Sequence, residues 1–329
     1  MKRTYKNLNN FPHGIMFHNF HDKIKFKKGD GSLSKEDLIK IIKFIGRKNI
    51  LNANDFIQKY RSNSLKKNDV CFTFDDGSKS QFDIALPVLK KYKIKAFFFI
   101  YSKCLQKNKT LSMEILKSFR INYFKNINIF YKEFFSYCED GIFNKLEKKK
   151  LIQKKLKDKY PFYSDLDIKF RVIRDNVLSE QSYLGIMKKM IKKKRLNINK
   201  LSKNIFFSKK NLIKLSSEGH IIGLHSHSHP LDISKKSYKK QYNEYFRNKI
   251  ILEKILVKTK HPRINSMSYP MGVYNTSSFK ALNDLNVNFG FISTILKREN
   301  KKLSKKNKDL TIAREDCSNI IKKINEIQN

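Results

Sequence analysis

Short apolar runs alternate along the chain with longer segments in which apolar residues recur at helical spacing. The short runs are typical of buried strands, because strands are shorter than helices and are bounded by turn residues. We expect strands at residues 14–17, 70–74, 95–100, 220–224, 266–269, 289–293 and 310–313. Between them we expect helices at residues 34–44, 54–60, 82–92, 238–257, 275–285 and 318–327, and the end of another helix at 212–217. Ser34 and Gly46 are suited to begin and end the first of these helices.

This alternation of strands and helices predicts crossover connections and a parallel sheet. Seven strands favour a closed barrel over an open sheet, so the expected fold class is α/β, a distorted (β/α)7-type barrel. The polar residues of greatest chemical interest all follow directly after predicted strands. In α/β barrels that carboxyl face carries the functional site.

Residues 104–207 interrupt the alternation. This stretch is rich in Lys, Phe, Tyr and Asn and has weak helical patterns, such as residues 142–157. We therefore predict two domains: a barrel made of residues 1–103 and 208–329, and a helical insertion at 104–207. A lid, a substrate-binding lobe and a bulky decoration are alternative interpretations of the insertion.

The formal net charge of the chain is +42. Such a charge suits proteins that bind nucleic acid or anionic lipid, and it would also attract an anionic substrate. The lysines are spread along the whole chain, however, as an AT-rich coding sequence would also give, and no nucleic-acid-binding motif accompanies them. We expect no specific nucleic acid partner and keep contact with an anionic membrane surface as an interpretation.

The four cysteines include no Cys-x-x-Cys pair, which favours a reduced compartment without disulfides. Residues 1–17 are charged but lack the apolar core of a secretory signal. The longest apolar run, residues 96–101, is too short to span a bilayer. We therefore expect a cytoplasmic protein.

Two adjacent carboxylates, Asp75 and Asp76, lie between the strand at residues 70–74 and Gly77. Neighbouring side chains of an extended segment point in opposite directions, but a sharp turn at the glycine can bring both into one pocket. One carboxylate could then bind a metal while the other acts as a base. Taken alone, Asp-Asp-Gly is also ordinary turn chemistry.

Three histidines, His225, His227 and His229, follow the strand at residues 220–224. Imidazoles at this spacing can converge on one cation, and two of them with one carboxylate leave metal positions open for water and substrate. The spacing does not decide which two would bind, because alternation along an extended segment puts all three on one side. A polar surface loop is the alternative interpretation.

These motifs resemble the polysaccharide deacetylases, the NodB-homology or carbohydrate esterase family 4 enzymes. Residues 73–77, Thr-Phe-Asp-Asp-Gly, and 225–230, which follow the pattern His-Ser-x-x-His-Pro, match two family motifs. Residues 268–272, Ser-Tyr-Pro-Met-Gly, are similar to a third, Arg-x-Pro-Tyr-Gly. The opening HGIMFHNF and the LTIARED segment near the end resemble members encoded among surface-polysaccharide genes. The resemblance spans most of the chain except residues 104–207.

The resemblance implies a role for each matching position. Asp75 matches the catalytic base, and Asp76, His225 and His229 match the ligands of a divalent metal, typically zinc. That metal lowers the pKa of a bound water and polarises the acetyl carbonyl. His227 falls on a variable position, where it is either a bystander or a substrate contact.

The third motif implies an oxyanion contact from the main-chain N–H of Met271, with Tyr269 beside it as a further substrate contact. Because a main-chain donor does not depend on the side chain, Met is expected to replace the family's Tyr at this position. Ser268 stands where the family often has an Arg that orients the base. We hypothesise that Arg314 replaces that Arg, since an Asp base beside another acid needs a nearby cation to stay ionised. A surface arginine is the alternative.

The family's C-terminal Leu-x-His, which supplies a general acid, is missing, because no histidine follows His261. His18 and His21 follow the first predicted strand and are candidate substitutes, and His18 is our choice. His13, at the other end of that strand, is a weaker one. A structural role is the alternative for each.

These inferences predict a metal-dependent hydrolase that removes an acetyl group from an N-acetylated sugar in surface polysaccharide or lipopolysaccharide biosynthesis. The expected substrate is a carbohydrate, with a nucleotide- or lipid-linked precursor favoured over a mature wall polymer. An O-acetyl esterase with the same site is one alternative. A carbohydrate-binding protein with impaired catalysis is another, although it would not be expected to keep all four matching metal and base positions.

Overall fold

The computed structural model describes residues 11–29, 31–106, 111–159, 163–295 and 303–328. The chain divides into two compact units. The first, which we call the barrel unit, combines Met1–Phe26, Gly31–Lys107 and Phe206–Asn329. The second, the insertion unit, consists of Asn108–Ile205 together with Lys27–Asp30.

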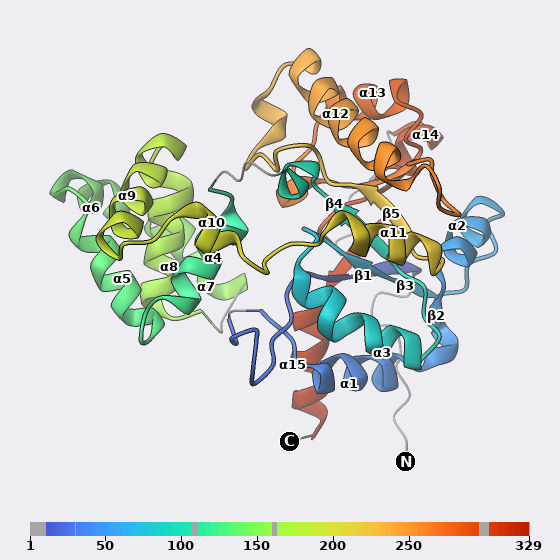
Figure 1. Cartoon of the computed structure of the whole chain (residues 1–329), viewed down its shortest axis with the longest axis horizontal. Coiled ribbons are helices and arrows are strands. Elements are labelled where there is room, and N and C mark those ends of the chain that lie inside the picture. The colour runs from blue at the N-terminus through green and yellow to red at the C-terminus, as the bar shows by residue number, and fades with distance from the viewer. Residues whose placement is uncertain (1–10, 30, 107–110, 160–162, 296–302, 329) are drawn as a thin grey trace. The chain divides into compact units, whose positions relative to one another are not determined.

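Parallel strands form the centre of the barrel unit (Figure 1). They are β1 (His13–Phe17), β2 (Ile50–Leu51), β3 (Val70–Phe74), β4 (Phe97–Ile100), β5 (Ile221–Leu224), β6 (Ser266–Ser268), β7 (Phe289–Phe291) and β8 (Arg314–Asp316). Their order in the sheet is β7-β6-β5-β4-β3-β1-β8, and β2 pairs beside this path with the first half of β3. Ile312, just before β8, bridges in parallel to Phe291 of β7. This bridge nearly closes the path of seven strands, which confirms the predicted distorted (β/α)7 barrel.

Helices connect successive strands and cover the outside of the barrel, with α1, α3 and α15 on one side of the strands and α12 and α13 on another (Figure 1). The helices of this unit are α1 (Lys35–Ile45), α2 (Ala53–Arg61), α3 (Leu86–Lys91), α11 (Lys209–Ser217), α12 (Tyr238–Leu256), α13 (Thr276–Asp284), α14 (Lys305–Lys308) and α15 (Cys317–Gln328). The predicted start of α1 is confirmed, because the Ser34 hydroxyl accepts a hydrogen bond from the Asp37 N–H and the Asp37 carboxylate accepts one from the Ser34 N–H. None of the helices that the structure describes is long and apolar enough to cross a membrane.

The inside of the barrel is filled by aromatic side chains. Phe97 and Phe99 of β4 and Phe289 and Phe291 of β7 are buried there together with Phe56 of α2. The rings of Phe97 and Phe291 are 5.2 Å apart at an edge-to-face angle, a favourable aromatic arrangement. Phenylalanines of opposite parity along the strands face outward to the helices, as the alternation of side chains in a strand requires.

Three element predictions need correction. The strand predicted at residues 310–313 is displaced, because the apolar residue Ile312 pairs with β7 while the polar residues Arg314–Asp316 form β8 against β1. The single helix sketched at residues 142–157 is two helices that meet near Lys148. The helix predicted at 82–92 begins as a π-helical turn, Gln81–Ala85, because Pro87 cannot donate to the carbonyl four residues before it.

The insertion unit is entirely helical among its described residues. Its α-helices are α4 (Met113–Asn122), α5 (Ile127–Ser136), α6 (Asp140–Glu147), α7 (Lys150–Lys159), α8 (Asp165–Val172), α9 (Glu180–Lys193) and α10 (Ile198–Ser202). At its centre Phe170 packs edge to face against Phe130 and Phe134, with ring centroids 5.4 Å and 4.9 Å apart. The unit therefore has a hydrophobic core of its own.

Candidate active site

The alternation of β3 places Asp75 inside the barrel mouth. Cys71 and Thr73 face the interior, and Asp75 continues the same side of the strand by one more step of two. Asp76 and Gly77 then have positive φ angles of 73° and 66°. This left-handed turn re-aims Asp76, so the two carboxylates that a straight strand would separate both lie at the carboxyl end of β3.

Asp75 is held by a buried polar network. Its Oδ1 accepts a hydrogen bond from Arg314 Nη1 at 2.8 Å, and its Oδ2 accepts one from Ser268 Oγ at 3.1 Å. Arg314 also donates from Nη2 to Ser268 Oγ at 2.8 Å and from Nη1 to Thr73 Oγ1 at 3.3 Å. Arg314 and Asp75 are only 1% and 2% exposed, so this ion pair is shielded from solvent. The hydrogen bonds fix the orientation of the two side chains.

The network fixes the charge of Asp75. Burial alone raises the pKa of this carboxyl, but the guanidinium of Arg314 and the imidazole of His225 outweigh burial and hold the pKa below the usual aspartate range. Gly14 of β1 leaves room for the aliphatic part of the Arg314 side chain, because a Cβ there would lie 3.0 Å from Arg314 Cγ.

Gln81 is a site residue that the sequence interpretation missed. Its side-chain Nε2 donates to the main-chain carbonyls of Asp75 and His18, and thereby ties the ends of β3 and β1 together. The sequence shows only a glutamine shortly after the Asp-Asp-Gly motif. That its amide is fully buried is visible in the structure alone.

His225 and His229 face Asp76. The Nε2 atoms of the two histidines lie 3.3 Å and 3.4 Å from Asp76 Oδ1. One ligand atom from each of the three residues lies within 4.8 Å of the others. Burial alone raises the pKa of Asp76, but hydrogen bonds from both imidazoles lower it well below the usual range.

Residues 225–229, which we call the histidine segment, are not extended. This corrects the expectation that alternation would put all three imidazoles on one side. Ser226 and His229 have positive φ angles of 61° and 54°. His227 therefore turns to Ser102, whose Oγ lies 2.8 Å from His227 Nδ1, and it takes no part in the cluster around Asp76.

The surroundings of His225 suit a metal ligand. Its Nδ1 lies 2.8 Å from the carbonyl oxygen of Ser268, and because a carbonyl can only accept, Nδ1 carries the proton. Nε2 is the nitrogen that faces Asp76: without a cation it bonds to that carboxylate through a proton, and a bound cation would take the place of that proton. A metal-binding imidazole is usually oriented by such a bond from its other nitrogen, so the two imidazoles and one carboxylate fit a divalent cation.

Helix α12 supports this segment from outside, through two residues that the sequence interpretation did not find. Asn248 accepts a hydrogen bond from the His225 N–H at 2.9 Å and donates to the Ile100 carbonyl at 2.9 Å. The Glu244 carboxylate accepts from the N–H groups of His227 and Ser228. The sequence offers one signal for Asn248: it is a polar residue at helical spacing with the buried residues Tyr245 and Leu252 of α12.

The third motif forms a tight turn after β6. Met271 has a positive φ of 55° and a half-exposed side chain, so its residue type is not fixed by packing. Gly272 is required, because its φ is 69° and a Cβ would lie 1.8 Å from Ser293 Oγ. Tyr269 is 1% exposed and its ring stacks on Tyr274 at 4.6 Å, so the structure does not present this side chain to a substrate.

The candidate general acids lie at different distances from the base. His18 follows β1 and is 36% exposed, with Nε2 4.0 Å from Asp75 Oδ2. His21 instead contacts Ser32, with Nδ1 2.9 Å from Oγ. His13 is buried at the opposite end of β1 near Glu315. Of the three, the structure brings only His18 to the cluster.

Comparison with known proteins finds several solved structures with the same fold, and three of them illustrate the likeness. A de-N-acetylase from Aggregatibacter actinomycetemcomitans has a TM-score of 0.54 and 14% identity, covering 95% of this chain and 99% of its own. The deacetylase PplD of Streptococcus pyogenes, in complex with acetate, has a TM-score of 0.53 and 14% identity, covering 95% and 97%. The BpsB deacetylase domain of Bordetella bronchiseptica has a TM-score of 0.52 and 10% identity, covering 94% and 96%. No curated protein sequence matches the chain.

The sequence model of one family matches residues 62–121 and 186–290, which together make up half of the chain. These segments contain Asp75, Asp76, His225, His229 and the third motif, whereas His18 and Arg314 lie outside them. The residues that gather at the barrel mouth are thus largely those of the matched segments. The chain belongs to the polysaccharide deacetylase family.

Proposed function

We propose that this protein is a metal-dependent hydrolase that removes the acetyl group from an N-acetylated sugar. The observation that carries the proposal is the approach of Asp76, His225 and His229 to one another beside a buried, ionised Asp75. Membership of the polysaccharide deacetylase family supports the carbohydrate substrate.

Asp76, His225 and His229 would hold the divalent cation, for which we propose zinc. When bound, such a cation acts as a Lewis acid and lowers the pKa of a water molecule that it binds. Asp75 is placed to accept the proton of the attacking water, because its ion pair with Arg314 keeps it unprotonated. We propose that Arg314 orients this base, in place of the arginine that the family often has at the position of Ser268.

The remaining steps fall to residues around the mouth. The Met271 N–H is proposed to donate to the oxyanion that forms at the acetyl carbon, while His18 protonates the departing amine. For His227 we propose the role of a bystander that takes no part in the reaction, since its side chain faces Ser102.

The biological setting is proposed separately from the chemistry. We propose a surface-polysaccharide or lipopolysaccharide precursor as substrate, nucleotide- or lipid-linked, in the cytoplasm. The formal charge of +42 supports an anionic substrate and contact with an anionic membrane surface.

Acetate release tests the proposal. A panel of N-acetyl sugar nucleotides, N-acetylated oligosaccharides and O-acetylated sugars would be incubated with the protein, with a chelator and with the chelator followed by excess zinc. We expect release from at least one N-acetylated substrate, its loss on chelation and its recovery with zinc. The variant Asp75→Asn should lower kcat by about 10²-fold or more while still binding metal. Sugar binding without release would contradict the proposal, and release from O-acetylated substrates alone would replace it with an esterase.

A further inference from the structure

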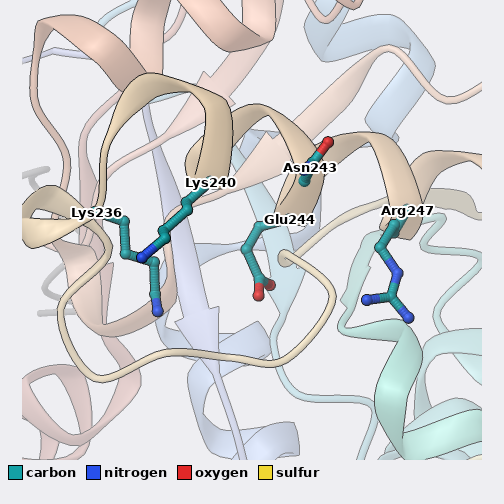
Figure 2. A pocket seen from close by; sticks show the side chains of 5 residues that line it. All are labelled: Lys236, Lys240, Asn243, Glu244 and Arg247. Atoms are coloured by element: carbon teal, nitrogen blue, oxygen red, sulfur yellow. The ribbon is translucent and has the colours of Figure 1, made fainter.

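A small pocket lies on the outer side of the histidine segment, against α12. It has a volume of about 190 Å³ and is lined by Lys236, Lys240, Asn243, Glu244 and Arg247. Figure 2 shows the side chains of Lys240, Glu244 and Arg247 along one side of α12, with Lys236 contributed by the segment that precedes the helix. A pocket below the usual volume of about 300–1,000 Å³ for whole small-molecule sites suits one compact polar group.

The positive charges of this pocket have no carboxylate partner among the residues that the structure describes. None of Lys236, Lys240 and Arg247 forms an ion pair there, although neighbouring lysines do. Lys235, for example, pairs with Asp232, and Lys249 pairs with Glu253. The three cations line one hollow, with Lys236 and Lys240 toward one end and Arg247 toward the other (Figure 2), and they keep their attraction for an anion.

Glu244 is the only acidic residue among the five that line the pocket, and its oxygens are already engaged. Oε2 accepts the N–H groups of His227 at 3.1 Å and Ser228 at 2.8 Å, and Oε1 accepts Ser228 Oγ at 2.7 Å. The carboxylate thus supports the histidine segment and does not pair with the lysines. With three cations and one anion, the lining has a net charge of +2.

We infer that this pocket binds the phosphoryl group of a phosphorylated ligand. A phosphate monoester carries about −1.5 to −2 charges at neutral pH and three acceptor oxygens, which matches the charge of the lining and its number of cationic donors. A carboxylate would leave part of that charge uncompensated. The inference does not depend on the proposed deacetylation, because none of Asp75, Asp76, His225 and His229 lines this pocket.

Calorimetric titration with pyrophosphate at physiological ionic strength tests the inference on the full chain. The test variants are Lys240→Gln and Arg247→Gln, which leave the Glu244 hydrogen bonds in place. The matched control is Lys239→Gln, which removes the same charge from an exposed position of the same helix outside the pocket lining. We expect each test variant to weaken pyrophosphate binding about 10-fold and the control to bind within twofold of the unmodified protein.

Two further measurements complete the test. Competition identifies the source of the phosphoryl group, and a chelator shows whether a bound metal contributes to the binding. A sugar 1-phosphate and vesicles containing phosphatidic acid, both phosphate monoesters, would each compete with pyrophosphate, and the stronger competitor indicates a soluble or a lipid-borne ligand. Binding should persist in the presence of a chelator, because the pocket contains no metal ligand. Absence of pyrophosphate binding, an equal loss in Lys239→Gln, or loss of binding on chelation would each overturn the inference. A catalytically inactive protein that binds normally would contradict the proposed function alone.

Discussion

At the scale of single residues, three histidines within one short segment have different surroundings. His225 and His229 direct Nε2 at Asp76, whereas His227 has its Nδ1 beside Ser102. Their spacing in the sequence could not separate these cases, because the two positive φ angles in the segment are a property of the folded loop.

Metal affinity should follow these surroundings. We expect His225→Gln and His229→Gln each to weaken zinc binding by about 100-fold or more, since each removes a nitrogen that faces the cluster. His227→Asn is the matched control, because the Asn oxygen can replace Nδ1 beside Ser102, and it should bind zinc within a few-fold of the unmodified protein. Titration against a competing chelator measures all three. Equal losses in all three variants would contradict the assignment of the ligands.

Arg314 offers a test of how the base is kept ionised. In Arg314→Ala, the burial of Asp75 is no longer opposed by the guanidinium, so the pKa of this carboxyl should rise. Because Asp75 acts in its unprotonated form, the acid limb of the kcat/KM profile should move to higher pH. At neutral pH we expect kcat to fall by about 10²-fold with a smaller change in KM.

Two controls separate positioning from folding in that experiment. Arg314→Lys keeps the charge but cannot reproduce all the guanidinium bonds, so it should restore the acid limb more fully than it restores kcat. Arg263→Ala removes an exposed arginine and should change neither. A folded Arg314→Ala protein with near-normal turnover would end the proposal that this residue orients the base.

At the scale of elements, α12 anchors the active-site segment through side chains that a helical pattern does not identify. The buried stripe of α12 includes the polar residues Gln241 and Asn248 beside Tyr245 and Leu252. Hydrophobic periodicity predicts the helix, and its start at Tyr238 is confirmed. The partners of Asn248 lie at the ends of β4 and β5, and those of Gln241 include Asn275 and Ser278 at the start of α13, so one sequence contains no signal for these contacts.

Asn248→Ala should destabilise the barrel. The substitution leaves the buried His225 N–H and Ile100 carbonyl without their partner, and each unsatisfied group costs about 1–3 kcal/mol, so we expect a loss of about 2–4 kcal/mol. Urea unfolding followed by circular dichroism measures this loss. Asn243→Ala, an exposed position on the same helix, should change the free energy of unfolding by less than about 0.5 kcal/mol. Similar effects of the two substitutions would contradict the anchoring role.

Element boundaries were predictable where local chemistry sets them. The strand at Val70–Phe74 and the helix after Ser34 have the expected positions, because turn and capping residues define their ends. The last strand was misplaced, since the apolar residue Ile312 pairs with β7 and the polar residues after it pair with β1. Which segment closes a barrel is decided by tertiary pairing, and apolar pattern alone does not reveal it.

At the scale of the whole molecule, the number of strands and their alternation with helices were enough to predict the barrel, while the position of the site at the carboxyl face stays a prediction. The interrupted rhythm at residues 104–207 led to the prediction of a helical insertion there, and the structure contains a compact unit made chiefly of Asn108–Ile205. The contribution of that unit to function stays a prediction, because neither its amino-acid pattern nor its own core identifies a ligand.

Excision of the insertion tests whether the barrel unit is self-sufficient. Tyr101 and Phe206 have ring centroids 5.8 Å apart, so the barrel brings together the segments that flank the insertion. A short Gly/Ser linker in place of residues 108–205 should therefore close a short loop at a small entropic cost. We expect the shortened protein to unfold cooperatively and to bind zinc within a few-fold of the full chain, because its aromatic core and metal cluster lie wholly in the barrel unit.

A second variant with a linker twice as long controls for strain. If both variants aggregate or lose zinc, the barrel requires the insertion; if both bind zinc but release no acetate from the full protein's substrate, the insertion belongs to the substrate-binding machinery and is not a decoration.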